Sequence, residues 1–313
     1  MSESRIRPSE LASTYSIVAL DQHTGQLGVA VQSHWFSVGS LVCWAEAGVG
    51  AVATQAMVNV DYGPLGLQLM REGDTAAQAL AALLNKDEGR AMRQVAMLDV
   101  RGYVATHTGE RCIAAAGHYA GEGYSVQANM MESATVWPAM AAAFERTPGD
   151  LATRMLSALD AAQSAGGDVR GRQSAAMRVV SARPCSHPWR GIVLDLRVED
   201  HPDPLVEMGR LLKLHEAYQH MNLGDELLGQ GQVEDALKEY GQAAALAPGI
   251  AELPFWHAVT LADVGRVAEA CELLRQVFAA DPALARLLPR LSAAGMLRDD
   301  PQLLADLLSV QPS

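Results

Sequence analysis

The stretch TYSIVALDQHTGQLGVAVQS, residues 14–33, decides the fold of the N-terminal part of the chain. Two runs of strand-forming residues, 15–20 and 27–33, flank a polar turn that contains Gly25. Such a pattern predicts a β-hairpin. Apolar residues occupy both faces of each run, so we expect strands that are covered on both sides.

Downstream of this hairpin, strands and helices come in blocks. A block of strands is followed by a pair of helices, then by more strands, a second helix pair and two last strands. Single alternating strand–helix units, as in a dinucleotide-binding fold, would not give this order, and no strand is followed by a glycine-rich phosphate-binding motif. Two antiparallel sheets packed between two helical layers, an α+β architecture, would give it. Strands are expected at 41–44, 50–54, 95–100, 103–107, 124–128, 173–181 and 191–198, and helices at 64–71, 75–84, 134–145 and 150–162.

The C-terminal part contains a 34-residue repeat. When residues 217–250 are shifted by 34 they fall on 251–284, so that Gly231 meets Gly265, Ala236 meets Ala270 and Pro248 meets Pro282. The period and the small residues are similar to those of tetratricopeptide (TPR) repeats, which are helical hairpins. Two repeats are fewer than the three or so that a free-standing solenoid needs. We therefore expect this tail to pack on the first domain or on a second subunit.

Composition restricts the classes of function. Hydrophobic residues make up 49% of the 313 residues and charged residues 19%, which is typical of a globular protein. The net charge is −12 and the chain has three lysines, which disfavours nucleic acid and anionic membranes as partners. The N-terminus lacks the apolar core of a secretory signal, and the longest apolar run, 41–58, is interrupted by polar residues and glycines. We expect a cytoplasmic protein.

The cysteines and histidines show no metal-ligand spacing. The four cysteines are scattered, which favours free thiols over disulfides or a zinc site. His201 precedes Asp203-Pro204, a pair that is typical of a helix N-terminus. No metal and no cofactor are therefore expected.

Several motifs of residues 14–215 resemble those of one bacterial family, the domain of unknown function 1028. The family is placed with the N-terminal-nucleophile (Ntn) hydrolase-like folds, so the resemblance implies a four-layer αββα sandwich. The similar segments are Thr14–Ala19, Ala47–Gln55, Asn59 with Tyr62-Gly63, His107–Gly109, Gly117-His118, Gly123–Gln127 with Asn129-Met130, Asp168–Ala175 and Asp195–Pro202.

The resemblance implies a role for Thr14. In Ntn hydrolases the first residue of the mature chain attacks an amide with its hydroxyl or thiol, and its own α-amine acts as the base. Thr14 stands at the matching position, before the first strand, but thirteen residues precede it, so this mechanism requires cleavage of the Ser13–Thr14 bond. Many such enzymes keep a lysine beside the nucleophile, and residues 41–55 contain none. We expect Ser33 and Asn129 to lie beside Thr14 and to take part in catalysis.

Other polar residues are candidates for substrate binding. Arg170 and Arg172 follow Asp168 in a glycine-rich approach to a strand, where two guanidinium groups could bind an anion or simply hold a turn. Polar amides at or after the ends of apolar strands, where oxyanion donors often sit, and a histidine able to act as acid or base complete the set: Gln55, Asn59, Gln127 and His107.

Two hypotheses of different class follow. The first is a hydrolase of an amide C–N bond in a small, anionic substrate, with a leader at 1–13, a catalytic domain at 14–215 and the TPR-like domain at 216–313. The second is a non-catalytic scaffold of the same fold that binds a small ligand, while residues 216–313 bind a protein partner or a second copy of the chain. The mature N-terminus discriminates between them, because only the first needs a free amine on Thr14.

Overall fold

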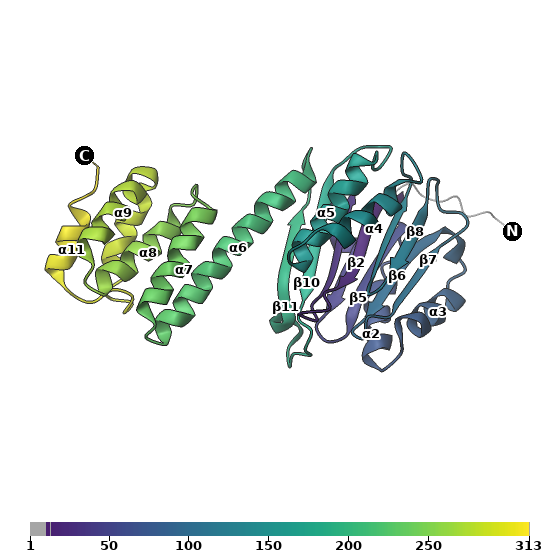
Figure 1. The fold of residues 1–313 in the computed structure, drawn as a ribbon, viewed down its shortest axis with the longest axis horizontal. Helices are drawn as coiled ribbons and strands as arrows, with labels where there is room; N and C mark the ends of the chain where they lie inside the picture. Colours follow the sequence, from purple (N-terminus) through teal and green to yellow (C-terminus); the bar gives the residue numbers. More distant parts are fainter. Residues whose placement is uncertain (1–10, 13, 313) are drawn as a thin grey trace. The chain divides into compact units, whose positions relative to one another are not determined.

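The computed structural model describes residues 11, 12 and 14–312, and the chain forms two compact units. The first unit ends at Gly209 and the second begins at Arg210. The first contains two antiparallel sheets with helices, and the second is helical (Figure 1). No helix among the described residues has both the length and the apolar character needed to cross a membrane.

Two antiparallel sheets form the centre of the first unit. The five-stranded sheet has the order β1-β5-β6-β7, and β4 also pairs with β5; the six-stranded sheet has the order β11-β10-β3-β2-β9-β8. The predicted hairpin of residues 14–33 is β2 and β3, at the middle of the second sheet. The strands are β1 (Leu11–Ala12), β2 (Thr14–Leu20), β3 (Leu27–Ser33), β4 (Cys43–Glu46), β5 (Gly50–Met57), β6 (Arg93–Asp99), β7 (Val104–Thr108), β8 (Gly117–Gly121), β9 (Tyr124–Asn129), β10 (Ser174–Val180) and β11 (Ile192–Val198).

Helices cover the outer faces of both sheets. In Figure 1, α2 (Tyr62–Arg71) and α3 (Ala76–Lys86) lie on the five-stranded sheet, and α4 (Val136–Arg146) and α5 (Leu151–Ser164) lie on the six-stranded sheet. Local signals explain two of the helix starts. The Thr75 hydroxyl and the Gln78 side chain form a reciprocal capping box at α3, and the Asp150 carboxylate accepts from Thr153 N at α5. One-turn helices occur at α1 (Gly39–Val42), η2 (Arg90–Met92) and η3 (Pro188–Gly191).

The layer between the two sheets has two chemically different ends. One end is apolar and contains fully buried valines, leucines and alanines of β2, β3, β5 and β6, among them Val18, Val29, Ala51 and Leu98. Toward the start of β2 the inward side chains become hydroxyls and amides, although they are equally buried. Burying polar groups is costly unless they are hydrogen-bonded. The buried hydroxyls and amides of the polar end must therefore be hydrogen-bonded.

Two local predictions were wrong. A strand was expected at 41–44, but 39–42 form the helical turn α1 and the strand starts at Cys43. The reason is that Val38 and Val42, four residues apart, are both buried in the inter-sheet core, a helical spacing. Strand β8 was not expected at all. Its sequence begins and ends in glycine, and it owes its form to pairing with β9.

The second unit repeats itself with the predicted period. Helix α7 (Val233–Leu246) shifted by 34 gives the bounds of α9 (Val267–Ala280), and the last residue of α6, Gly229, shifts onto the last residue of α8, Asp263. Gly231 and Gly265 have φ of +77° and +90° at the equivalent turns, a conformation that favours glycine. The helices are α6 (Pro204–Gly229), α7, α8 (Glu252–Asp263), α9, α10 (Pro282–Leu287), η4 (Leu288–Arg290) and α11 (Pro301–Leu308).

Close helix packing explains the small residues of the repeat. A Cβ on Gly224 would lie 2.6 Å from the ring of Tyr240, so only glycine allows this approach. Tyr240 and its repeat equivalent Leu274 are both buried in one apolar cluster with Ala236 and Ala270.

Candidate functional site

A row of four polar residues crosses the six-stranded sheet at the start of β2. Thr14 pairs with Asn129 of β9 on one side and with Ser33 of β3 on the other, and Ser33 pairs in turn with Ser174 of β10. All four are at most 2% exposed. Because cross-strand partners point to the same side of a sheet, their side chains share one face. That face is the polar end of the inter-sheet layer.

The contacts of Thr14 bring three of the predicted residues together. Its Oγ1 lies 3.3 Å from Ser33 Oγ. Its carbonyl oxygen lies within reach of two side-chain amides, with Gln55 Nε2 at 3.2 Å and Asn129 Nδ2 at 3.4 Å. Gln55 belongs to β5, so this carbonyl is contacted from both sheets.

Gln94 of β6 is the hub of the polar end. Its Oε1 accepts from Gln55 Nε2 at 2.7 Å and from Asn129 Nδ2 at 3.0 Å. Its Nε2 lies 2.9 Å from Thr108 Oγ1, 3.0 Å from the carbonyl of Ala128 and 3.1 Å from that of Gly117. Gln94 is fully buried, so these contacts are shielded from water.

The network continues in two directions. Along the interior, Ser16 Oγ donates to Gln55 Oε1 at 2.5 Å, Gln127 Nε2 donates to Ser16 Oγ at 2.6 Å, and Ser125 Oγ donates to Gln127 Oε1 at 2.9 Å.

Toward the surface, Thr108 Oγ1 lies 2.8 Å from Nδ1 of the exposed His118. Loss of hydration around its ring and the neighbouring His107 lower the pKa of His118. Neutral His118 Nδ1 can then accept the Thr108 hydroxyl proton, which agrees with Gln94 donating to the same hydroxyl oxygen.

Two strained residues adjoin the amides that face Thr14. Ala56 follows Gln55 with φ of +69°, and Met130 follows Asn129 with φ of +59°. Non-glycine residues rarely adopt this conformation, and such outliers occur preferentially at functional sites. Met130 is held by Ile113 O, and its own carbonyl accepts from Val169 N.

The loop 168–173 passes along the same end of the six-stranded sheet. Asp168 forms a bridge with Met131, next to the end of β9, and its carboxylate accepts from His34 N at 3.2 Å, next to the end of β3. Arg170 pairs with Asp168 at 3.1 Å, and Arg172 pairs with Asp203. The two guanidinium groups thus lie on a loop at the Thr14 end, and each is held by a carboxylate.

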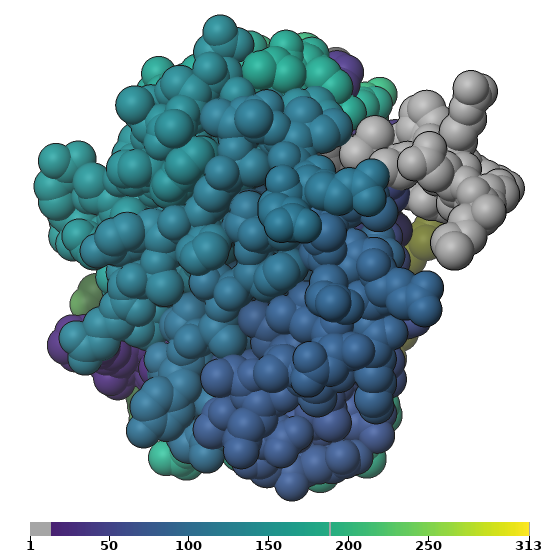
Figure 2. Space-filling model, turned by 90° about the vertical axis from the view of Figure 1, so that its right-hand side faces the viewer, coloured from purple at the N-terminus to yellow at the C-terminus, as the bar shows by residue number. Residues whose placement is uncertain are grey.

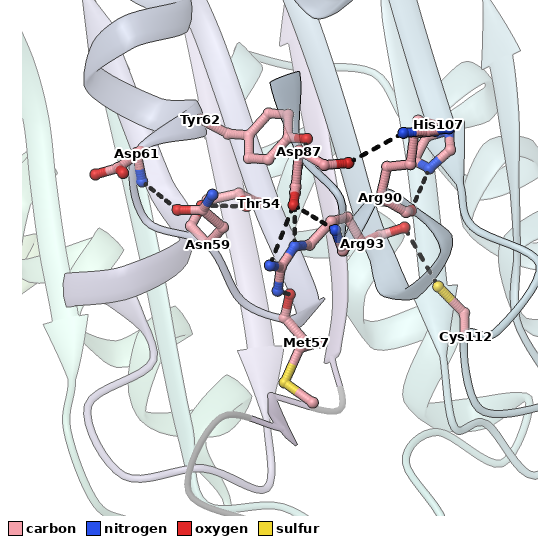
Figure 3. A network of polar contacts seen from close by, with 11 residues as sticks. Thr54, Met57, Asn59, Asp61, Tyr62, Asp87, Arg90, Arg93, His107 and Cys112 are labelled. Atoms are coloured by element: carbon pink, nitrogen blue, oxygen red, sulfur yellow. Dashed lines mark hydrogen bonds and ion pairs between the residues drawn. The ribbon is translucent and has the colours of Figure 1, made fainter. Parts of the chain in front are cut away.

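Asn59 and His107 belong to another part of the first unit, on the outer side of the five-stranded sheet (Figure 3). The Asn59 carbonyl accepts from Thr54 Oγ1, and its side chain accepts from Asp61 N. His107 Nε2 lies 2.7 Å from the carbonyl of Arg90. Among the described residues, these hydrogen bonds do not join either one to the Thr14 network, which His107 influences through the pKa of His118.

Figure 3 centres on the ion pair of Asp87 and Arg93. Asp87 accepts from Arg93 Nε at 2.8 Å, Tyr62 Oη at 3.0 Å and Gly89 N at 2.7 Å. Arg93 Nη1 also donates to the carbonyl of Met57 at 2.7 Å, at the end of β5 just beyond Gln55 and Ala56. The pair therefore anchors the strand end from which Gln55 reaches Thr14.

Blue and teal segments form most of the face that Figure 2 shows, and they come from α2, α3 and the chain that follows up to α5. Among the described residues no group of three or more His, Cys, Asp or Glu side chains could hold a metal ion. The polar side chains of the Thr14 site are hydroxyls and amides.

Sequence reasoning missed four members of this network: Ser16, Gln94, Thr108 and Ser125. Gln94 gave one signal that could have been used. It shares a strand face with Ala96 and Leu98 of the inter-sheet core, and a glutamine at such a position is unusual. Gln55, Gln127 and Asn129 were expected at or after strand ends. Asn129 is the last residue of β9, whereas Gln55 lies within β5 and Gln127 within β9, and all three side chains point inward.

Comparisons with known proteins agree with the limits of the first unit. The model of the family of unknown function DUF1028 matches residues 14–208. A crystal structure of a DUF1028 protein from Silicibacter pomeroyi is similar with a TM-score of 0.58 and 31% sequence identity, over 64% of this chain and 88% of that one. No curated protein matches the chain. The match from Thr14 onward covers more than half of the sequence, and the chain belongs to the DUF1028 family.

Proposed function

We propose that the chain is an N-terminal-nucleophile-type hydrolase of an amide C–N bond, with Thr14 as its nucleophile. The observation that carries the proposal is the position of Thr14: it opens a central strand, its hydroxyl adjoins Ser33, and two amide nitrogens adjoin its carbonyl. Two facing antiparallel sheets with helices on their outer sides support an Ntn-hydrolase-like sandwich.

The mechanism needs a free α-amine on Thr14. Ser13 lies outside the described residues, so the leader 1–13 and the cleavage of the Ser13–Thr14 bond are part of the proposal. The freed amine takes the hydroxyl proton as Oγ1 attacks the substrate carbonyl, and it returns the proton to the leaving nitrogen. The resulting ester on Thr14 is hydrolysed by water, which releases the acid and restores the hydroxyl.

The other residues have supporting roles in this proposal. Ser33 orients the Thr14 hydroxyl. The Asn129 N–H that meets the Thr14 carbonyl in the resting structure turns to the oxyanion, with Gln55 and Gln127 beside it. An anionic substrate group would bind Arg170 and Arg172 by taking the place of the carboxylates of Asp168 and Asp203. Asn59 and His107 lie on the outer side of the five-stranded sheet and have no part in this mechanism.

Intact mass of the purified protein tests the nucleophile directly. We expect a species that starts at Thr14, and its absence would contradict the standard mechanism. A threonine-reactive β-lactone should label this species once per chain. Thr14→Ala should abolish labelling, whereas the matched control Thr54→Ala should not. Thr54 is equally buried, but its hydroxyl bonds to Asn59 O on the outer side of β5.

A second candidate function is a non-catalytic scaffold that binds a small ligand while a TPR-like tail binds a protein or a second copy of the chain. The observation in its favour is a groove of about 540 Å³ in the second unit, lined by residues of both charge signs. This hypothesis predicts an unprocessed chain, and a Thr14→Ala variant with unchanged ligand binding. Sedimentation of the full chain, with and without Lys238→Glu at the groove, tests self-association. The lining residues are Glu234, Leu237, Lys238, His257, Leu261, Arg266, Glu269, Glu272 and Leu273.

A further inference from the structure

We propose that Gln94 is a positioning residue of the Thr14 site, which sets the direction in which the side-chain amides of Gln55 and Asn129 point. The idea deepens the proposed function and rests on it. Gln94 acts through these two amides, whose nitrogens reach the Thr14 carbonyl.

Two backbone carbonyls determine the orientation of Gln94 itself. The oxygens of Gly117 and Ala128 lie 3.1 and 3.0 Å from one end of its side-chain amide. A carbonyl oxygen can only accept a hydrogen bond, so the group that faces these two oxygens must be the NH₂. The rotated amide would place a third oxygen against them. Gln94 Oε1 must therefore face Gln55 and Asn129.

The orientation of Gln94 then determines the next two amides. An oxygen at the centre of the network requires donors on both sides, so Gln55 and Asn129 each present nitrogen to it, at 2.7 and 3.0 Å. Each NH₂ group has a second hydrogen, and the Thr14 carbonyl lies 3.2 and 3.4 Å from the same two nitrogens. Both amides are thereby arranged as N–H donors beside the residue that we propose as nucleophile.

The remaining contacts agree with this assignment. With its nitrogen toward Gln94, Gln55 turns its Oε1 to Ser16, whose hydroxyl donates to it. Ser16 then accepts from Gln127 Nε2, and Gln127 Oε1 accepts from Ser125. The hydroxyl hydrogens of Ser16 and Ser125 are each used once. A rotated Gln55 would present oxygen to both Gln94 Oε1 and the Thr14 carbonyl, and burying such opposed acceptors costs free energy.

The experiment compares Gln94→Met with Gln94→Glu in the full chain. Methionine keeps the approximate length of the side chain but has neither donor nor strong acceptor. Protonated glutamic acid can both accept from the two amides and donate to a carbonyl, whereas the ionised form would oppose the oxygens of Gly117 and Ala128. Gln32→Met is the matched control: Gln32 is also fully buried, but it contacts Tyr15 on the opposite face of the six-stranded sheet.

Two readouts are used. Side-chain NH₂ signals of Gln55 and Asn129 in a ¹⁵N-labelled sample report the amides directly. We expect Gln94→Met to shift these signals and to speed their hydrogen exchange about tenfold or more, and Gln32→Met to leave them in place. The second readout is β-lactone labelling of Thr14, which should slow about tenfold or more in Gln94→Met, since a lost oxyanion donor costs at least that much.

The Gln94→Glu variant gives the signature that general destabilisation cannot. Burial raises the pKa of a carboxyl group, so this variant should keep amide signals and labelling close to those of the parent chain at low pH and lose both as pH rises. The parent chain should show no such loss.

The outcomes separate the two proposals. Unchanged amide signals in folded Gln94→Met, or pH-independent behaviour of Gln94→Glu, would overturn the positioning role. If the parent chain is neither processed nor labelled, the proposed function fails, and the amide signals alone then decide the role of Gln94. Shifted amides with undiminished labelling would overturn it as a positioning residue for Thr14.

Discussion

Replacing Asp87 by Asn tests how firmly the end of β5 is held. Asp87 and Arg93 have side chains that are 12% and 16% exposed, so the pair is largely buried. Removing one partner of a fully buried pair costs about 3–5 kcal/mol. Arg93 keeps its bond to the Met57 carbonyl, and Asn can still accept from Tyr62 or Gly89. We therefore expect a loss of about 2–3 kcal/mol in the free energy of unfolding of the first unit.

Urea unfolding followed by tryptophan fluorescence measures this loss, because four of the five tryptophans belong to the first unit and one, Trp256, to the second. Asp61→Asn is a suitable control, since Asp61 is exposed and contacts Asn59 through its backbone N–H. A loss for Asp87→Asn within about 0.5 kcal/mol of the control would refute the reasoning, because that is the size of an exposed ion pair.

The stability of the parent chain should depend on pH more strongly than that of Asp87→Asn. Burial alone would raise the pKa of Asp87, but hydrogen bonds from Arg93, Gly89 and Tyr62 overcome this effect and lower it. A carboxyl group with a lowered pKa stabilises the folded state above its unfolded pKa of about 3.9, and the contribution disappears as pH falls through the folded value. The parent chain should therefore lose more stability than Asp87→Asn between pH 5 and the acid limit.

Three further predictions concern packing and the buried thiol. Leu274→Ala should lower the stability of the second unit by about 2–5 kcal/mol in a circular-dichroism melt, because Leu274 is fully buried in its apolar cluster, and a change no larger than that of the exposed Leu223→Ala would contradict this. Gly224→Ala should destabilise the same unit by about 1–3 kcal/mol despite the better helix propensity of alanine, since the added methyl group meets Tyr240; a stabilised variant would show that the ring can move away. Burial raises the pKa of Cys43 to about 12, so at pH 8 iodoacetamide should modify it only after unfolding, as mass spectrometry of tryptic peptides would show.

The helical unit was the most predictable part from sequence. Its period is carried by residues whose reasons are local, such as Gly231 and Gly265 with positive φ, and small residues where helices meet. An α+β first unit with antiparallel sheets was also predictable, because hairpins and helix pairs leave their patterns within short windows. Strand β8 was not, since Tyr119 is its one strand-forming residue and its pairing with β9 is a tertiary effect.

The candidate site was predictable only in part. Thr14, Ser33 and Asn129 were expected to lie together, and the register of β2 with β3 and β9 places them in one row. Sequence alone left that register open, because apolar residues occupy both faces of the two hairpin strands. A shift of one residue would turn every side chain to the other face. The role of Gln94 was not predictable from sequence either, because it depends on how the two sheets face each other.

The division of the inter-sheet layer into an apolar end and an amide-rich end has a consequence for how water enters the protein. At the apolar end, separating the sheets exposes hydrocarbon and gains no hydrogen bonds in return. At the other end, arriving water molecules can replace the partners of Gln55, Gln94 and Asn129 one by one. Transient separation of the two sheets should therefore begin at the start of β2. The backbone amide of Ser16 should then exchange with deuterium sooner than those of Val18 and Val29 on the same hairpin.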